Sequence, residues 1–125
     1  KQDLYKLGIS SVTNFAYPFG DFNSISEEIV SRNFDSARTT ISGLNDNSSN
    51  RYELKFVAAV DKTSFAYIKS MIDSAIKNKK WLILVFHRIN ETGNPISAGS
   101  SLLDQVLQYA KDKNLPVVPN RDVVR

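Results

Sequence analysis

The chain has 125 residues, of which 42% are hydrophobic and 23% charged, and its formal net charge is +3. This length and composition predict one globular domain with its own core. The absence of cysteine excludes a disulfide scaffold and thiolate metal sites. The longest apolar run is far shorter than the roughly 20 residues of a membrane span, so no transmembrane segment is expected.

The first segment predicts the end of a helix followed by a strand. Leu4 and Leu7 have helical spacing, and Gly8 is the residue type expected just past a helix C-terminus. No cap or first turn precedes them, so we expect a helix whose beginning is missing. Residues 12–17 are β-branched and aromatic enough for a strand, which a proline and a glycine then close.

The next segment predicts a helix and two strands. The capping-box spacing of residues 24–27 predicts a short helix to about Asn33. Residues 34–42 and 52–60 are strand candidates, and the turn formers of residues 43–51 predict a polar loop between them.

An amphipathic helix follows, with Thr63 or Ser64 as its cap. Lys77, Lys79 and Lys80 lie where this helix ends, where cations complement the helix dipole. We therefore interpret them as a helix terminus and expect no nucleic-acid partner. The apolar residues at helical spacing, expected to face the core, are Phe65, Ile68, Ile72, Ala75 and Ile76.

The C-terminal segment predicts a buried strand, a loop, a helix and a short strand. The strand is "WLILVF", residues 81–86, and a loop at 90–100 separates it from a helix at 101–113. "LPVVP", residues 115–119, is a final strand candidate before a short tail. The helix residues expected to face inward are Leu102, Leu103, Val106, Leu107 and Ala110.

Alternation of helices with about five strands predicts an α/β fold with a parallel sheet covered by helices. The continuous hydrophobicity of residues 81–86 agrees, because parallel strands are buried on both faces. A closed (β/α)₈ barrel needs roughly 250 residues. We therefore expect residues 1–125 to be the C-terminal portion of a distorted TIM-like (β/α) barrel, and the alternative is a self-contained small open sheet.

Two segments place unusual residues at strand ends, where reactive groups cluster in parallel α/β folds. One is the aromatic turn at residues 15–20, and the other is His87, the only histidine. An imidazole there can act as a general acid or base near neutral pH. Each segment also has a structural interpretation, as a tight turn with core aromatics and as a solvated histidine.

Together, "NFAYPFGDFN" and "LILVFHRI" resemble the third and fifth motifs of the polysaccharide deacetylases with a NodB homology domain, carbohydrate esterase family 4. The spacing of the motifs and the ending "LLDQVLQYAKDKNLPVVPNRDVV" also fit that family. The resemblance covers essentially the whole chain as the C-terminal half of the family's catalytic domain. It implies that the N-terminal half is absent from this chain.

The resemblance implies a role for several residues. His87 matches the general acid that protonates the departing amine. The backbone N–H of Phe19 matches the donor that holds the developing oxyanion, a role that needs a preorganised donor. Tyr17 and Pro18 would shape the substrate groove, and Val85 would line the acetyl pocket.

The chain also departs from the family. Ala16 stands where the family usually has an arginine that orients the catalytic base, and Arg38 is a candidate substitute. The family's fourth motif, built around Asp and Trp, is not recognisable in "FDSARTTISGLN". The divalent metal of the family, expected to be zinc, has its ligands in the N-terminal half, so we expect no metal ligand here and no activity of this chain alone.

The expected function is metal-dependent removal of N-acetyl groups from an N-acetylglucosamine-containing polysaccharide of the chitin, peptidoglycan or poly-N-acetylglucosamine type. The expected location is extracellular or at a bacterial cell surface. One alternative is a non-catalytic carbohydrate-binding or structural module of the same fold. Another is an unrelated open α/β domain in which His87 is only structural.

Overall fold

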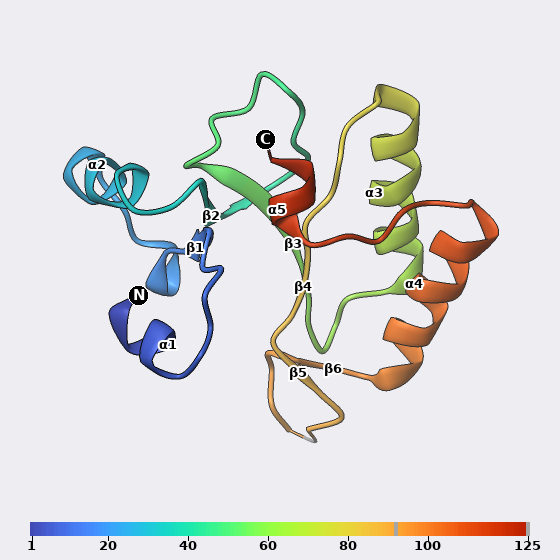
Figure 1. The fold of residues 1–125 in the computed structure, drawn as a ribbon. Coiled ribbons are helices and arrows are strands. Elements are labelled where there is room, and N and C mark those ends of the chain that lie inside the picture. The colour runs from blue at the N-terminus through green and yellow to red at the C-terminus, as the bar shows by residue number, and fades with distance from the viewer. Residues whose placement is uncertain (92, 125) are drawn as a thin grey trace.

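The computed structural model describes residues 1–91 and 93–124. Four parallel strands form one curled sheet in the order β1-β2-β3-β4 (Figure 1). The predicted α/β class with parallel strands is confirmed. The strands of this sheet are β1 (Asn14–Ala16), β2 (Ser36–Ser42), β3 (Leu54–Ala59) and β4 (Leu84–Phe86).

The helices flank the two ends of the sheet. α2 lies beside β1 and β2, whereas α3 and α4 lie side by side next to β3 and β4 (Figure 1). The connection from β2 to β3 is the predicted polar loop. The helices are α1 (Gln2–Lys6), the 3₁₀ turn η1 (Pro18–Gly20), α2 (Ser24–Ser31), α3 (Phe65–Asn78), α4 (Ser100–Asp112) and α5 (Asn120–Val123).

Two predictions about the C-terminal region are wrong. The segment at 115–119 is not a strand, because it contains two prolines and a proline has no N–H to donate to a neighbouring strand. The predicted loop at 90–100 contains strand β6 (Ser97–Ala98), which pairs in parallel with β5 (Arg88–Ile89).

The start of α2 also differs from the predicted capping box. The cap is Asn23, whose side-chain oxygen accepts a hydrogen bond of 2.9 Å from the Ser26 N–H. In return, the Ser26 hydroxyl accepts one of 2.9 Å from the Asn23 N–H. The box is therefore formed one residue earlier than predicted, because asparagine in an extended conformation caps a helix as well as serine does.

Strand β3 is covered on both faces. Val57 and Ala59 pack against α3 and α4, whereas Leu54 and Phe56 belong to a second cluster on the opposite, concave face. Ile83, just before β4, joins the concave-face cluster. This two-sided burial explains why the sequence of β4 is continuously apolar and why that of β3 is apolar except at the exposed Lys55.

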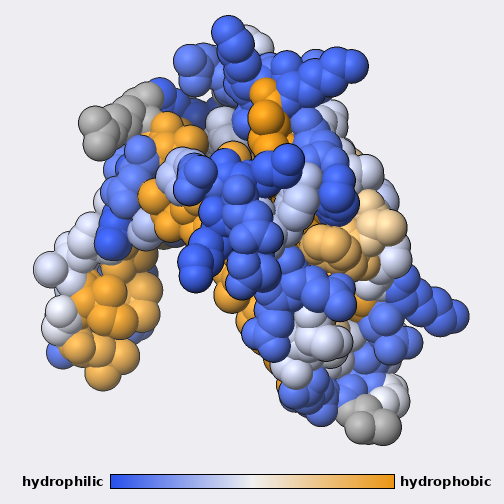
Figure 2. All heavy atoms as spheres, turned by 90° about the vertical axis from the view of Figure 1, so that its right-hand side faces the viewer, coloured by the Kyte–Doolittle hydropathy of each residue, from blue (hydrophilic) through white to orange (hydrophobic). Residues whose placement is uncertain are grey.

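Two residues predicted to face inward are largely exposed. Ile76 of α3 and Leu107 of α4 are 45% and 47% exposed. Both line a groove of about 560 Å³ between α3, α4, the approach to β4 and residues 115–118. Their spacing does place them on the apolar faces of their helices, but no side chain of the described residues fills the space that they face. Figure 2 looks onto the right-hand side of Figure 1, where α3 and α4 lie and where apolar side chains interrupt a mainly hydrophilic surface.

A polar cluster joins the outer sides of α3 and α4. Asp73 accepts a hydrogen bond from the Tyr109 hydroxyl and forms an ion pair of 2.6 Å with Lys69. The Lys69 ammonium also lies 4.9 Å from the centre of the Tyr109 ring. The hydrogen bonds from Lys69 and Tyr109 hold the pKa of Asp73 below its usual value of 3.8.

We expect Asp73→Asn to lower the melting temperature at pH 7 and to have no effect in strong acid. Because the pKa of Asp73 is lower in the folded state, its contribution is present above pH 3.8 and is lost as the pH falls through the depressed pKa. Thermal unfolding of both proteins between pH 7 and pH 2 measures this, with the exposed Asp104→Asn variant as the control. A difference that stays constant down to pH 2 would contradict the role of the carboxylate charge.

Candidate functional site at the carboxyl ends of the strands

The turn after β1 presents Phe19 to solvent. Its ring is fully exposed, with a relative accessibility of 101%, and its backbone lies in the left-handed region at φ 56° and ψ 6°. A bulky residue in this conformation is strained by about 1–3 kcal/mol. Pro18 precedes it with its fixed φ, and Gly20 follows at φ 75°. The turn therefore maintains an exposed aromatic group that packing in the chain does not explain.

The backbone of the same turn leaves one donor unused. The Gly20 N–H donates to the Tyr17 carbonyl and the Asp21 N–H to the Pro18 carbonyl, at 2.9 and 3.2 Å. Within residues 1–91 and 93–124, the Phe19 N–H donates no hydrogen bond. A free N–H in a constrained turn is the kind of group that can stabilise a negative oxygen.

Tyr17 lies in the core and not in an open groove. It is 4% exposed, and its ring stacks on Phe22 at 5.0 Å and meets the edge of Phe15 at 5.5 Å. Its hydroxyl is buried without a hydrogen-bond partner in the described part of the chain. Burial, followed by the charges of Glu27 and Glu53, raises the pKa of this hydroxyl. The structure therefore places Tyr17 under α2, where it supports the turn from behind.

His87 and Val85 lie at the other end of the sheet. Val85 is in β4 and packs with the concave-face cluster of Leu54, Phe56 and Ile83. His87 is exposed and occupies the bend between β4 and β5. Because β4 ends at Phe86, the strand periodicity that would place Val85 and His87 on one face stops before the histidine.

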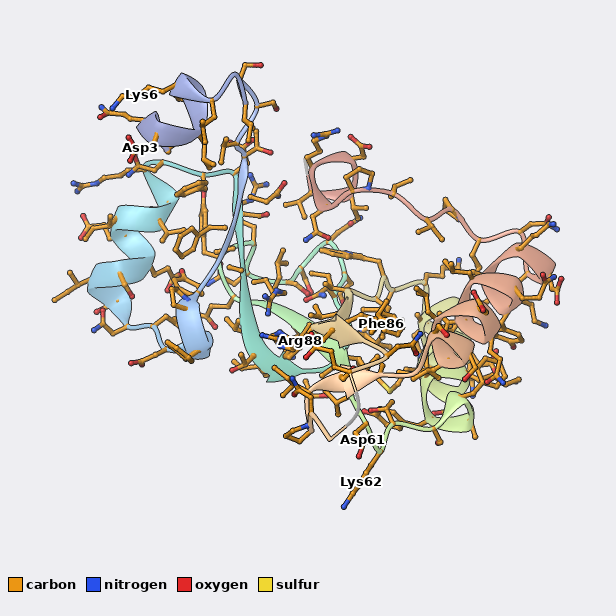
Figure 3. The ribbon with its side chains drawn as sticks, turned by 90° about the horizontal axis from the view of Figure 1, so that it is seen from below. Asp3, Lys6, Asp61, Lys62, Phe86 and Arg88 are labelled. Atoms are coloured by element: carbon orange, nitrogen blue, oxygen red, sulfur yellow. The ribbon has the colours of Figure 1, made fainter. Side chains whose placement is uncertain are left out.

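The two motifs lie on the outermost strands of one sheet. In a parallel sheet, the carboxyl ends of all strands lie at the same edge. Strands β2 and β3 lie between β1 and β4, so the two motifs are separated by a distance on the order of 14 Å along the sheet. Figure 3 labels Phe86 and Arg88, which flank His87, and Asp61 and Lys62, which follow β3. Asp61 was not predicted from the sequence. Its signal was a carboxylate two residues after the end of a buried strand, whereas His87 follows the end of β4 immediately.

Arg38 is the neighbour of Ala16 in the sheet. The two are Cα partners in the parallel register of β1 and β2, and the Tyr17 N–H donates to the Arg38 carbonyl at 3.1 Å. The Arg38 guanidinium lies 5.2 Å from the centre of the Phe56 ring. The arginine suggested by the sequence as a substitute for the residue missing at position 16 is thus directly beside that position.

The described residues do not form a metal site. No group of three or more histidine, aspartate or glutamate side chains that could hold a metal ion occurs within residues 1–91 and 93–124. The carboxylate of Asp46 is occupied in its own loop. It accepts hydrogen bonds from Ser48 and forms an ion pair of 2.9 Å with Lys80, and these bonds lower its pKa. The residues present do not fit a bound divalent ion.

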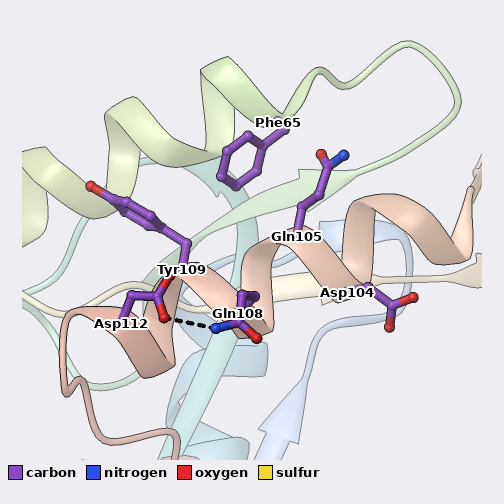
Figure 4. Close-up of a pocket in the computed structure, with 6 residues that line it drawn as sticks. All are labelled: Phe65, Asp104, Gln105, Gln108, Tyr109 and Asp112. Atoms are coloured by element: carbon purple, nitrogen blue, oxygen red, sulfur yellow. Dashed lines mark hydrogen bonds between the residues drawn. The ribbon is translucent and has the colours of Figure 1, made fainter.

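A second hollow lies on the outer side of α3 and α4, remote in sequence from both motifs. Figure 4 shows it between Phe65 and the exposed face of α4, where Gln108 donates a hydrogen bond of 2.7 Å to Asp112. The hollow is open to solvent, and one of its two amide side chains, that of Gln108, is already paired with Asp112. It contains no group from the β1 turn or from the end of β4. The residues that line it are Phe65, Asp104, Gln105, Gln108, Tyr109 and Asp112.

The fold and the site define an α/β protein with four parallel strands and chemistry-bearing residues at their carboxyl ends. In comparisons with known proteins, no family model matches the chain, and no curated protein or solved structure matches it significantly. Among the described residues, no helix has the length and apolar character needed to cross a membrane.

Proposed function

We propose that the chain is the C-terminal half of a polysaccharide deacetylase domain, a segment of a TIM-like (β/α) barrel that removes N-acetyl groups from an N-acetylglucosamine-containing polymer. The observation that carries the proposal is the unpaired N–H of the strained Phe19 turn on one outer strand, with His87 at the end of the other. Closing the curled sheet into a barrel would arrange these strand ends around one mouth.

The proposed division of labour follows from the chemistry of amide hydrolysis. Collapse of a tetrahedral intermediate requires a proton for the departing amine, and in this proposal the exposed imidazole of His87 supplies it. The Phe19 N–H would hold the oxyanion, and the apolar side chain of Val85 would contact the acetyl methyl group. In this proposal Tyr17 and Pro18 hold the turn at the groove.

The proposal includes a divalent metal, zinc, but not a site for it in this chain. The described residues do not form a ligand set, so the metal would be held by the other half of the domain. That half and the N-acetylated polysaccharide are the proposed partners, and a bacterial cell surface or the extracellular space is the proposed location. The roles proposed for His87 and Phe19 do not require this chain to supply a ligand to the metal ion.

The test is acetate release by the protein expressed from its complete reading frame. We expect release from N-acetylglucosamine oligomers that is lost when zinc is chelated, and a turnover reduced by about 10²-fold or more in His87→Ala. His87→Gln should reduce the turnover by as much, because a glutamine amide still forms hydrogen bonds but cannot transfer a proton to the departing amine. Unchanged turnover in both variants would remove the acid assignment.

The fully exposed Phe19 ring favours a second candidate, a non-catalytic glycan-binding module. An exposed aromatic face can stack on a sugar ring without any hydrolysis. Binding of the oligomers that is lost in Phe19→Ala, with no acetate released by the complete protein, would support the module over the enzyme.

A further inference from the structure

The hollow on the outer side of α3 and α4 has a distinctive lining (Figure 4). Within the described residues, its volume of about 520 Å³ is enclosed by two aromatic, two amide and two carboxylate side chains, with no aliphatic side chain, lysine or arginine. Such a lining does not suit a lipid or an apolar peptide. Hydroxyl groups can donate to its carboxylates and both donate to and accept from its amides. The chemistry of the hollow therefore favours a ligand with many hydroxyl groups.

Helix α4 presents these polar groups in two rows. Asp104, Gln108 and Asp112 follow one another at intervals of four residues, so they lie along one face of the helix. Eight residues of α-helix span about 12 Å, which makes this row longer than a single sugar ring. Gln105 and Tyr109 form the neighbouring row, on the side of α3 (Figure 4). The hollow can therefore contact consecutive units of a saccharide chain.

Phe65 supplies an aromatic surface that is held in place. Its ring meets Tyr109 edge to face at 5.9 Å, and the Tyr109 hydroxyl donates a hydrogen bond to Asp73. Lys69 and Lys113 lie over the Tyr109 ring, at 4.9 and 5.7 Å from its centre. Among the described residues, no cation lies over Phe65. The partly exposed Phe65 ring is thus the aromatic surface that remains for a ligand.

The charges of the lining are negative. Asp104 and Asp112 are exposed, and within residues 1–91 and 93–124 neither takes part in an ion pair. The Asp112 carboxylate accepts a hydrogen bond from Gln108, which leaves its charge in place. Lys113, the next residue, offsets part of the charge at that end. The end of the hollow at Asp104 is therefore the more negative one, where a cationic group is attracted and an anionic group repelled.

We propose that this hollow is a second saccharide-binding site that takes an oligomer of amino sugars, with an ammonium group at Asp104 and a sugar ring on Phe65. The inference rests on the proposed function, because hydrolysis of N-acetyl groups converts a neutral polymer into one that carries ammonium groups. The site would hold the deacetylated product and not the substrate.

The experiment titrates three probes into the protein expressed from its complete reading frame and follows the NMR signals of the Phe65 ring and the Gln105 side-chain amide. These signals report the hollow and not the strand ends. Tetramers of glucosamine and of N-acetylglucosamine differ in their acetyl groups and hence in charge, and methylammonium chloride supplies a cation without a sugar. We expect the glucosamine tetramer to bind about fivefold more tightly than the acetylated one at low ionic strength.

High salt should remove this preference, because the Debye length at 1 M is about 3 Å. Equal affinity for the two tetramers at low salt, or Phe65 signals that do not respond to either, would overturn the inference. Equal affinity for methylammonium and the glucosamine tetramer would overturn its saccharide part.

Variants with a matched control assign the preference to Asp104. Asp104→Asn should reduce it to below about twofold, whereas Asp104→Glu should retain it, because the charge is kept. Asp3→Asn changes the net charge equally but on α1, and it should leave the preference unchanged. Phe65→Leu, followed at Gln105, should weaken both tetramers by about threefold or more. A preference that survives in Asp104→Asn would overturn the assignment.

Binding is measured without hydrolysis, so the two proposals fail separately. A protein that prefers the glucosamine tetramer in the hollow but releases no acetate would remove the deacetylase proposal and leave the second site supported. A protein that releases acetate and binds both tetramers equally in the hollow would do the reverse.

Discussion

Replacement of Ile68 by alanine should destabilise the protein by about 3–4 kcal/mol, near the middle of the range for large-to-small changes in a core. Ile68 is fully buried, at 0% exposure, and packs from α3 against Val57, Ala59 and Leu102. Strand β3 and helix α4 contact it from two sides, so neither can move into the cavity without losing its other contacts. Denaturant unfolding followed by circular dichroism measures the loss as a lower midpoint at an unchanged slope.

The matched control is Ile76→Ala on the same helix. Ile76 is 45% exposed and faces the open groove, so its truncation removes less buried surface and creates no enclosed cavity. We expect a loss below about 1 kcal/mol. Similar losses for the two variants would mean that the groove is filled in solution and that Ile76 is as buried as its periodicity predicts.

Replacement of Gly20 by alanine should destabilise the protein by about 2–5 kcal/mol and displace the turn that carries Phe19. A side chain in the left-handed conformation costs about 1–2 kcal/mol, and Gly20 has φ 75°. In addition, the new Cβ would lie 2.0 Å from the Thr40 hydroxyl oxygen. Relief of such an overlap costs about 1–3 kcal/mol more. Unfolding measurements and the amide signal of Phe19 report the two effects.

Gly8→Ala separates the two causes. Gly8 has a similar φ of 83°, but a Cβ added there would have no atom of another residue within 4 Å beyond its chain neighbours. Its replacement should therefore cost no more than about 1–2 kcal/mol. Removing the Thr40 side chain, in Gly20→Ala with Thr40→Gly, should recover part of the loss. A Gly20→Ala protein that matches Gly8→Ala in stability would show that β2 yields at Thr40.

The long helices could be predicted from the sequence because their signals are local. The apolar spacing and the Ser64 cap indicate α3, and the Ser64 side chain accepts a hydrogen bond from the Tyr67 N–H at 3.2 Å. The segment at 115–119 was wrongly predicted to be a strand. Its apolar composition is typical of a strand, but composition does not show whether a neighbouring strand can pair with it. The burial of Ile76 was overestimated for a related reason, since periodicity shows which face is apolar but not what covers it.

The candidate site was predicted in part. The sequence indicated the turn at Phe19 and the histidine after β4 as points of chemistry, and the structure has both at the ends of parallel strands. It did not reveal that Tyr17 is buried under α2, because an aromatic residue before a turn suits a core or a groove equally well. The sequence suggested Arg38 as a substitute for the arginine absent at position 16, but it did not show where Arg38 lies.

By itself, the sequence determined the alternation of helices and strands, the Ser64 cap of α3 and the glycine-dependent turn. All of these depend on residues a few positions apart. Only the tertiary structure decided that Ala16 and Arg38 are neighbours, that the guanidinium lies over Phe56 on the concave face, and that no carboxylate in the described residues meets it. Strand order and register in the four-stranded sheet join residues that are far apart in the sequence, such as Ala16 and Arg38. They follow from how the sheet packs as a whole and not from local sequence preference.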